Sequence, residues 1–79
     1  MSDYSQYLDY IFTLLGALKQ DFPLTENTDL VGDFGLSSLQ VMELIEQIED
    51  HFDMSIPLNI LPDVNTVGDL ARKLQDLNG

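Results

Sequence analysis

Residues 33–44, DFGLSSLQVMEL, decide the fold and point to the chemistry of this chain. A glycine-containing turn precedes two adjacent serines, and a helical pattern follows them. Ser37 and Gln40 have the S-x-x-Q spacing of a capping box, which predicts that Ser37 caps a helix beginning at Ser38. The free N–H groups and the dipole at a helix start favour an anion, so the Ser38 hydroxyl is well placed to carry a phosphate ester. Serines are also favoured at helix starts for capping alone, and geometry leaves both interpretations open.

The predicted helix over residues 38–52 has two different faces. Apolar residues at helical spacing form one stripe, which we expect to face the core: Val41, Leu44, Ile45, Ile48 and Phe52. The other side is acidic and also carries an apolar pair one turn from Ser38. We interpret it as a surface for docking partner proteins, formed by Leu39, Met42, Glu43, Glu46 and Glu49. An ordinary solvated face is the alternative, since single exposed apolar side chains are common.

The rest of the chain also has a helical pattern. A first helix should end at Pro23, because a proline excludes the α conformation from the residue before it. Its inner face would comprise Tyr4, Leu8, Ile11, Leu15, Leu18 and Phe22. The long connection over 23–36 should pack on the core through Leu24, Leu30, Val31, Phe34 and Leu36.

The last third of the sequence predicts two more helices. A short one is expected over 58–61, between two prolines. The final helix begins after Thr66, with Asp69 as its capping partner. Its inner face would comprise Val67, Leu70, Ala71, Leu74 and Leu77. The predicted fold class is all-α, a small four-helix bundle of three longer helices and one short helix, in a single domain over 1–79.

The charge of the chain restricts its partners. The net charge is −11, from 14 acidic residues against Lys19, Arg72 and Lys73. Binding to nucleic acid or to an anionic membrane surface would need the opposite sign. We therefore expect a protein partner with a basic patch, guided by electrostatic attraction. The alternative is that the charge only keeps the protein soluble.

The residue types exclude several kinds of site. With no Cys there is no disulfide, thiolate metal site or cysteine nucleophile. His51, the single histidine, lacks the partners of a catalytic triad, so we place it on the surface and predict no catalytic residue. The spacing in TENTDLVGDFG (25–35) does not match a calcium loop, and we predict no metal site. Without a signal peptide or an apolar run long enough to cross a bilayer, we expect a free-standing cytoplasmic protein.

The segments DFGLSSLQVMELIEQIEDHFDMSIPLN (33–59) and NTVGDLARKL (65–74) resemble the acyl carrier protein family. In that family a Gly-x-Asp-Ser-Leu turn presents the serine that receives 4′-phosphopantetheine. Gly35, Ser38 and Leu39 match this turn, so the resemblance implies that Ser38 is the attachment residue. The similarity continues along the chain at Glu43, Leu44, Ile56, Pro57, Thr66 and Val67.

Two positions depart from the family pattern. Ser37 stands where the family usually has Asp, and Gln40 stands at a position that is often acidic. Ser still caps a helix, so the fold should be unaffected. A negative charge beside Ser38 is lost, which leaves open which transferase and which partner enzymes recognise the chain best. The substitutions suggest a discrete, specialised member of the family.

The resemblance implies a carrier rather than an enzyme. A phosphopantetheinyl transferase, with Mg²⁺ and coenzyme A, would attach 4′-phosphopantetheine to Ser38. The carrier, expected to be a monomer, would present acyl thioesters to acyl-loading and acyl-processing enzymes of fatty-acid, polyketide or related biosynthesis. Two alternatives remain: a stand-alone aminoacyl or peptidyl carrier of a nonribosomal pathway, and an unmodified acidic helical adaptor.

Overall fold

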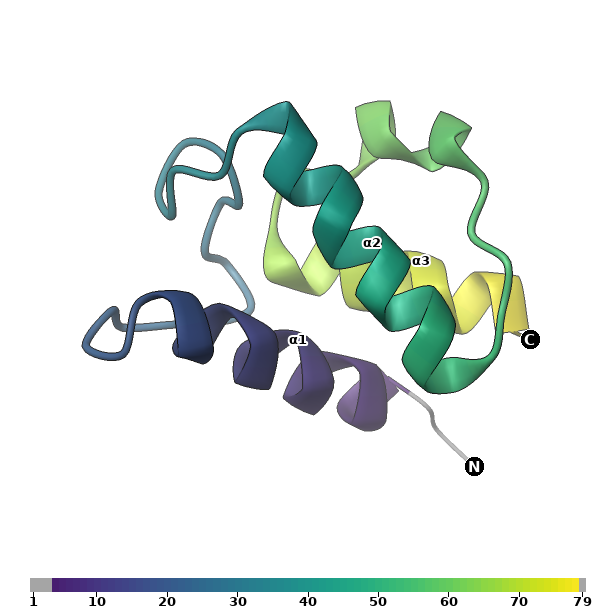
Figure 1. Cartoon of the computed structure of the whole chain (residues 1–79), viewed down its shortest axis with the longest axis horizontal. Coiled ribbons are helices and arrows are strands. Elements are labelled where there is room, and N and C mark those ends of the chain that lie inside the picture. The colour runs from purple at the N-terminus through teal and green to yellow at the C-terminus, as the bar shows by residue number, and fades with distance from the viewer. Residues whose placement is uncertain (1–3, 79) are drawn as a thin grey trace.

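The computed structural model describes residues 4–78, which form an all-α fold. Its helices are α1 (Tyr4–Leu18), α2 (Ser38–Phe52), the 3₁₀ helix η1 (Leu58–Asp63) and α3 (Val67–Asn78). In Figure 1, α2 crosses in front of α3, and α1 lies below these two helices in the view. The only extended pairing within residues 4–78 is an isolated bridge between Asp29 and Thr66. The predicted fold class is therefore confirmed.

The core lies where the three longer helices meet. The predicted inner stripe of α2 is confirmed: Leu44, Ile45 and Ile48 are buried, and Val41 and Phe52 pack against them from the edge. On α3, four of the five predicted core residues are buried: Val67, Leu70, Ala71 and Leu74. Leu77 is instead an exposed side chain, because it lies in the last turn of α3 beyond this core.

Helix α1 ends four residues before the predicted end at Phe22. Its buried residues are Tyr7, Ile11 and Leu15, so the prediction is confirmed for Ile11 and Leu15, while Tyr7 was not predicted. Tyr4 and Leu8 of the predicted face are partly buried and pack against this core. Leu18, predicted to be in the core, is 61% exposed. Phe22 lies outside the helix and packs edge-on against Phe34, with 4.9 Å between the ring centroids. The helix ends early because the chain turns here to bring the connecting segment onto the core.

Aromatic contacts join the start of α1 to the end of α2. The ring of Tyr7 meets Phe52 at 4.8 Å, and Tyr10 stacks on His51 at 3.9 Å between centroids. His51 is exposed, as predicted for a surface residue. This cluster lies at the end of α2 opposite Ser38 and fixes how the two helices pack together.

The connection between α1 and α2 is anchored as predicted, with one exception. Leu30, Phe34 and Leu36 are buried, but Val31 is 60% exposed. The side chain of Asp29 accepts hydrogen bonds from the N–H groups of Val31 and Gly32, at 3.0 and 2.7 Å. In this tight turn Leu30 and Phe34 point inward, so Val31 between them points outward.

The short helix η1 extends past Pro62 to Asp63, two residues beyond the predicted end at Leu61. Proline is tolerated because a 3₁₀ helix this short needs few internal donors. The N–H of Val64 closes the last turn on the carbonyl of Leu61 at 3.1 Å. Among residues 4–78, no helix has the length and hydrophobicity needed to cross a membrane.

Candidate functional site

The start of α2 separates the roles of its two serines. Ser37 has an extended backbone, with φ −78° and ψ 167°. Its Oγ accepts a hydrogen bond from the N–H of Gln40 at 3.2 Å, and the Gln40 Oε1 accepts one from the N–H of Ser37 at 2.9 Å. This is the predicted capping box, and it occupies the Ser37 hydroxyl. Ser38, the first residue of the helix, is exposed, and its hydroxyl makes no hydrogen bond within residues 4–78.

A glycine turn delivers the chain to this position. Gly35 has φ 87°, a left-handed conformation that is unfavourable for any residue with a Cβ. The next residue, Leu36, is buried, and its N–H bonds the carbonyl of Leu30 at 3.0 Å. Ser37 and Ser38 follow in solvent. The chain therefore passes from the buried Leu36 to the exposed Ser38 within three residues.

Ser38 opens onto an apolar hollow of about 180 Å³ between α2, the α1–α2 connection and η1. Ser38 is the one polar side chain in its lining, whose other members are Leu30, Val31, Val41, Met42, Leu61 and Val64. Val31, which is exposed and not part of the core, forms part of this wall. This hollow could not be predicted from the sequence, because its lining comes from three separated segments.

The predicted docking residues lie along the exposed side of α2. Leu39 is 65% exposed and Met42 39%, and Glu43 and Glu46 are also exposed. Glu49 differs, because it is half-buried and its Oε2 accepts a hydrogen bond from the N–H of Ile56 at 2.8 Å. Its carboxylate therefore has a structural task in holding the chain after α2.

A second hollow, of about 320 Å³, runs along this side of α2. Its lining combines apolar and acidic side chains: Leu39, Met42, Glu43, Ile45, Glu46, Glu49, Ile56 and Leu58. Leu58, at the start of η1, is an exposed apolar residue that the sequence reasoning did not select. The signal available in the sequence was an apolar residue directly after Pro57, at the start of the short helix expected over 58–61.

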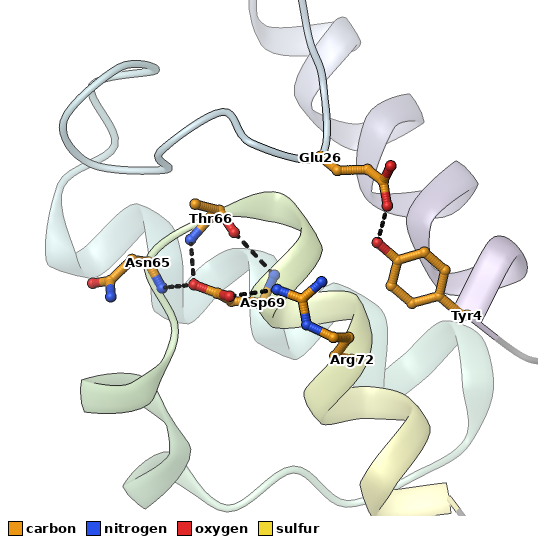
Figure 2. Close-up of polar contacts among 6 residues, drawn as sticks. All are labelled: Tyr4, Glu26, Asn65, Thr66, Asp69 and Arg72. Atoms are coloured by element: carbon orange, nitrogen blue, oxygen red, sulfur yellow. Dashed lines mark hydrogen bonds and ion pairs between the residues drawn. The ribbon is translucent and has the colours of Figure 1, made fainter.

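The start of α3 carries the second predicted capping box, shown in Figure 2. The N–H of Asp69 donates to the Thr66 Oγ1 at 3.0 Å, and Asp69 Oδ2 accepts from the N–H groups of Thr66 and Asn65, each at 3.1 Å. Arg72 bonds the other carboxylate oxygen at 2.7 Å. The pKa of Asp69 is lowered, chiefly by the hydrogen bond from the Thr66 N–H, with Asn65 and Arg72 adding to it.

The connection that leads to Ser38 is bound to this helix start. Backbone hydrogen bonds run from Val67 to Thr28 at 3.0 Å and from Gly68 to Glu26 at 2.8 Å. The Tyr4 hydroxyl of α1 also donates to the side chain of Glu26 (Figure 2), which raises the pKa of Tyr4. The α1–α2 connection is therefore held at its middle by α3 before it reaches Gly35.

Comparison with known proteins assigns the family. A family model described as the phosphopantetheine attachment site matches residues 10–74. This chain belongs to the phosphopantetheine-binding acyl carrier protein family. Members of this family are carriers and not enzymes, and they hold 4′-phosphopantetheine covalently.

Two similar proteins agree with this assignment. A "probable acyl carrier protein" of Caulobacter vibrioides (strain NA1000 / CB15N) is 47% identical over 45 residues, which are 57% of this chain and 52% of that protein. The match thus spans about half of the relative's length. A solved structure from Mycobacterium tuberculosis, assigned as an acyl carrier protein, is 32% identical with a TM-score of 0.76. It covers 86% of this chain, and the match includes 93% of that structure's chain.

The start of α2 fits the prosthetic group of this family. Ser38 offers an exposed hydroxyl without a competing hydrogen bond, and the helix N-terminus favours the phosphate of the ester. The adjoining apolar hollow leaves room beside the hydroxyl. An arm held by Ser38 would supply a thiol for thioester chemistry, which this chain without Cys lacks. Among residues 4–78, no three His, Asp or Glu side chains converge as a metal site.

Proposed function

We propose that this protein carries acyl intermediates as thioesters on a 4′-phosphopantetheine arm attached to the Ser38 hydroxyl. The observation that carries the proposal is that the two serines at the start of α2 have different environments. Ser37 is committed to capping, whereas Ser38 is exposed and free to be modified. Membership of the family implies that a phosphopantetheinyl transferase modifies the protein and that biosynthetic enzymes are its later partners.

We assign partner docking to the exposed side of α2, formed by Leu39, Met42, Glu43 and Glu46, with Leu58 of η1 beside it. Carboxylates next to exposed apolar side chains suit a partner that combines basic residues with an apolar contact. Glu49, fixed by its hydrogen bond from the Ile56 N–H, adds negative charge to the lining of the same hollow. Such contacts should be transient and salt-sensitive, because the carrier must leave one enzyme for the next.

The cargo we favour is an acyl chain of fatty-acid, polyketide or related biosynthesis. The support is the apolar lining of the hollow beside Ser38, which offers no charged or amide side chain to a polar cargo. An aminoacyl cargo carries an ammonium group that would lose its hydration there without an ion-pair partner. The neutral Ser37–Gln40 pair is the basis for regarding this chain as a specialised carrier.

The absence of Cys allows a direct test. The protein is incubated with coenzyme A, Mg²⁺ and a broad-specificity phosphopantetheinyl transferase, freed of small molecules, and titrated with a thiol reagent. The expected result is one thiol per chain for the wild type and for Ser37→Ala, and none for Ser38→Ala. Acylation of the modified protein should then remove the thiol. A wild type that acquires no thiol, or a Ser38→Ala variant that does, would refute the proposal.

A further inference from the structure

Lys19 makes an unusual set of contacts for a surface lysine. It lies one residue beyond the end of α1, and its Nζ donates a hydrogen bond to the backbone carbonyl of Phe34. The same ammonium lies 4.8 Å from the ring centroid of Phe34 and 5.6 Å from that of Phe22. A cation over aromatic faces and on a carbonyl is bound by three favourable electrostatic contacts at once.

In a chain of net charge −11, it is unusual that the Lys19 ammonium binds a backbone carbonyl and no carboxylate of residues 4–78. Of the three basic residues in the sequence, Arg72 and Lys73 pair with Asp69 and Asp63 on or beside α3. Lys19 has no ion-pair partner among residues 4–78, although the net charge of the chain is −11. Its charge therefore holds a backbone group of the connecting segment and does not neutralise a carboxylate.

The carbonyl bound by Lys19 belongs to the residue directly before the turn that leads to Ser38. Phe34 directly precedes Gly35, whose φ of 87° redirects the chain toward α2. A Cβ on Gly35 would lie 3.6 Å from the Lys19 Nζ, so the ammonium rests against the turn itself. Fixing the Phe34 carbonyl fixes one end of the peptide group that enters Gly35, four residues before Ser38.

We propose that Lys19 is a positioning residue for the modification of Ser38. Its ammonium joins the end of α1 to the Phe34 carbonyl and so holds the Gly35 turn in the conformation that presents the start of α2. This inference rests on the proposed function, because it assumes that Ser38 is modified. It adds a role for α1, a helix that contributes no residue to the attachment turn or to the docking surface.

The test compares transferase kinetics of the full chain and its variants under the conditions used for thiol titration. Lys19→Met keeps the apolar stem but removes the ammonium, and kcat for modification should fall about fivefold to tenfold. Lys19→Arg keeps the charge and the donor, so it should restore most of kcat. Lys73→Met is the matched control, since it removes one positive charge from α3, where Lys73 pairs with Asp63 and not with a residue of the turn. It should leave kcat unchanged and at most lower KM through stronger attraction to a basic partner.

Hydrogen exchange of the backbone amides provides a second readout that does not depend on modification. In Lys19→Met, exchange at residues 34–38 should accelerate, while exchange in α3 stays at the wild-type rate. Circular dichroism checks that each variant is folded at the assay temperature. If Lys19→Met does not fold, Lys19→Gln, which keeps a donor without the charge, takes its place with the same expected result.

The outcomes separate the two proposals. Unchanged kcat and unchanged exchange at residues 34–38 in the charge-removed variant would overturn the positioning role, and so would an equal loss of kcat in Lys73→Met. A wild type that is not modified would overturn the proposed function. In that case faster exchange at residues 34–38 would show that Lys19 still holds the turn, and unchanged exchange would overturn that as well.

Discussion

The starts of α2 and α3 use the same local motif in opposite surroundings. Each has a hydroxyl residue as its cap and a partner three residues later, Ser37 with Gln40 and Thr66 with Asp69. The start of α3 is enclosed, because Val67 and Gly68 are buried and bonded to the α1–α2 connection. The start of α2 is open to solvent at Ser38. The capping motif defines a helix start, and the packing around it decides whether that start is structural or functional.

The two starts also differ in charge. The α3 box contains a carboxylate and an arginine, so the positive end of its helix is already matched by an anion. The first turn of α2 contains no acidic residue, and its box is neutral. The N-terminus of α2 is therefore available to a phosphate ester on Ser38. The predictions below test this contrast, in order of decreasing effect on stability.

Gly68→Ala should give the largest loss, because it places a side chain inside the enclosed start. A Cβ there would lie 3.1 Å from the Glu26 carbonyl oxygen and 3.3 Å from the Tyr4 hydroxyl. We expect the free energy of unfolding to fall by about 1–3 kcal/mol in urea denaturation. Gly16→Ala is the matched control, since nothing lies within 4 Å of a Cβ in that position of α1. It should gain about 0.5–1 kcal/mol. Equal effects at both positions would contradict the enclosed packing.

Ser37→Ala should lower the free energy of unfolding by about 1 kcal/mol, because the N–H of Gln40 loses its acceptor. Ser37→Asp should retain the stability, since Asp is as good a cap. Thermal melts of both variants measure this difference. A stability unchanged in Ser37→Ala would mean that the capping hydroxyl contributes nothing to α2.

Asp69→Asn should cost less, about 1 kcal/mol or below at neutral pH, because solvent reaches and screens its half-buried carboxylate. The folded-state pKa of Asp69 lies below its usual value of 3.8, so the stabilisation is complete above that pH. It is lost as the pH falls through the folded-state pKa. Unfolding curves of wild type and variant should therefore differ near neutral pH and converge in acid. A difference independent of pH would contradict the charged cap.

Glu43→Lys should have the smallest effect on stability, within about 0.5 kcal/mol, because Glu43 is exposed. Binding to a partner with a basic patch should weaken several-fold, as measured by surface plasmon resonance at low salt. Asp76→Lys on α3 makes the same charge change away from the docking surface and should have little effect on binding. An equal loss in both variants would mean that net charge, and not the side of α2, guides docking.

The sequence predicted the parts of the fold that depend on neighbours along the chain. The span of α2, its Ser37–Gln40 box and the Thr66–Asp69 box follow from local spacing and were predicted correctly. The end of α1 and the exposure of Val31 were not, because packing between distant segments determines them.

The same limit applies to the candidate site. The exposed side of α2 could be recognised from periodicity, but the hollow beside Ser38 is built from three segments. The hydrogen bond between Lys19 and Phe34 joins residues 15 positions apart. The hydrogen bond between Glu49 and Ile56 joins a residue of α2 to one that follows the helix. No spacing rule relates such pairs, so only the folded chain could reveal them.

The account depends most on the separate roles of the two serines at the start of α2. The direct measurement is tandem mass spectrometry of the chain after incubation with coenzyme A and the transferase, which locates the added group on a single residue. The account predicts 4′-phosphopantetheine on Ser38 in both wild type and Ser37→Ala, and no adduct in Ser38→Ala. Phosphopantetheine on Ser37, or an adduct that persists without the Ser38 hydroxyl, would contradict it.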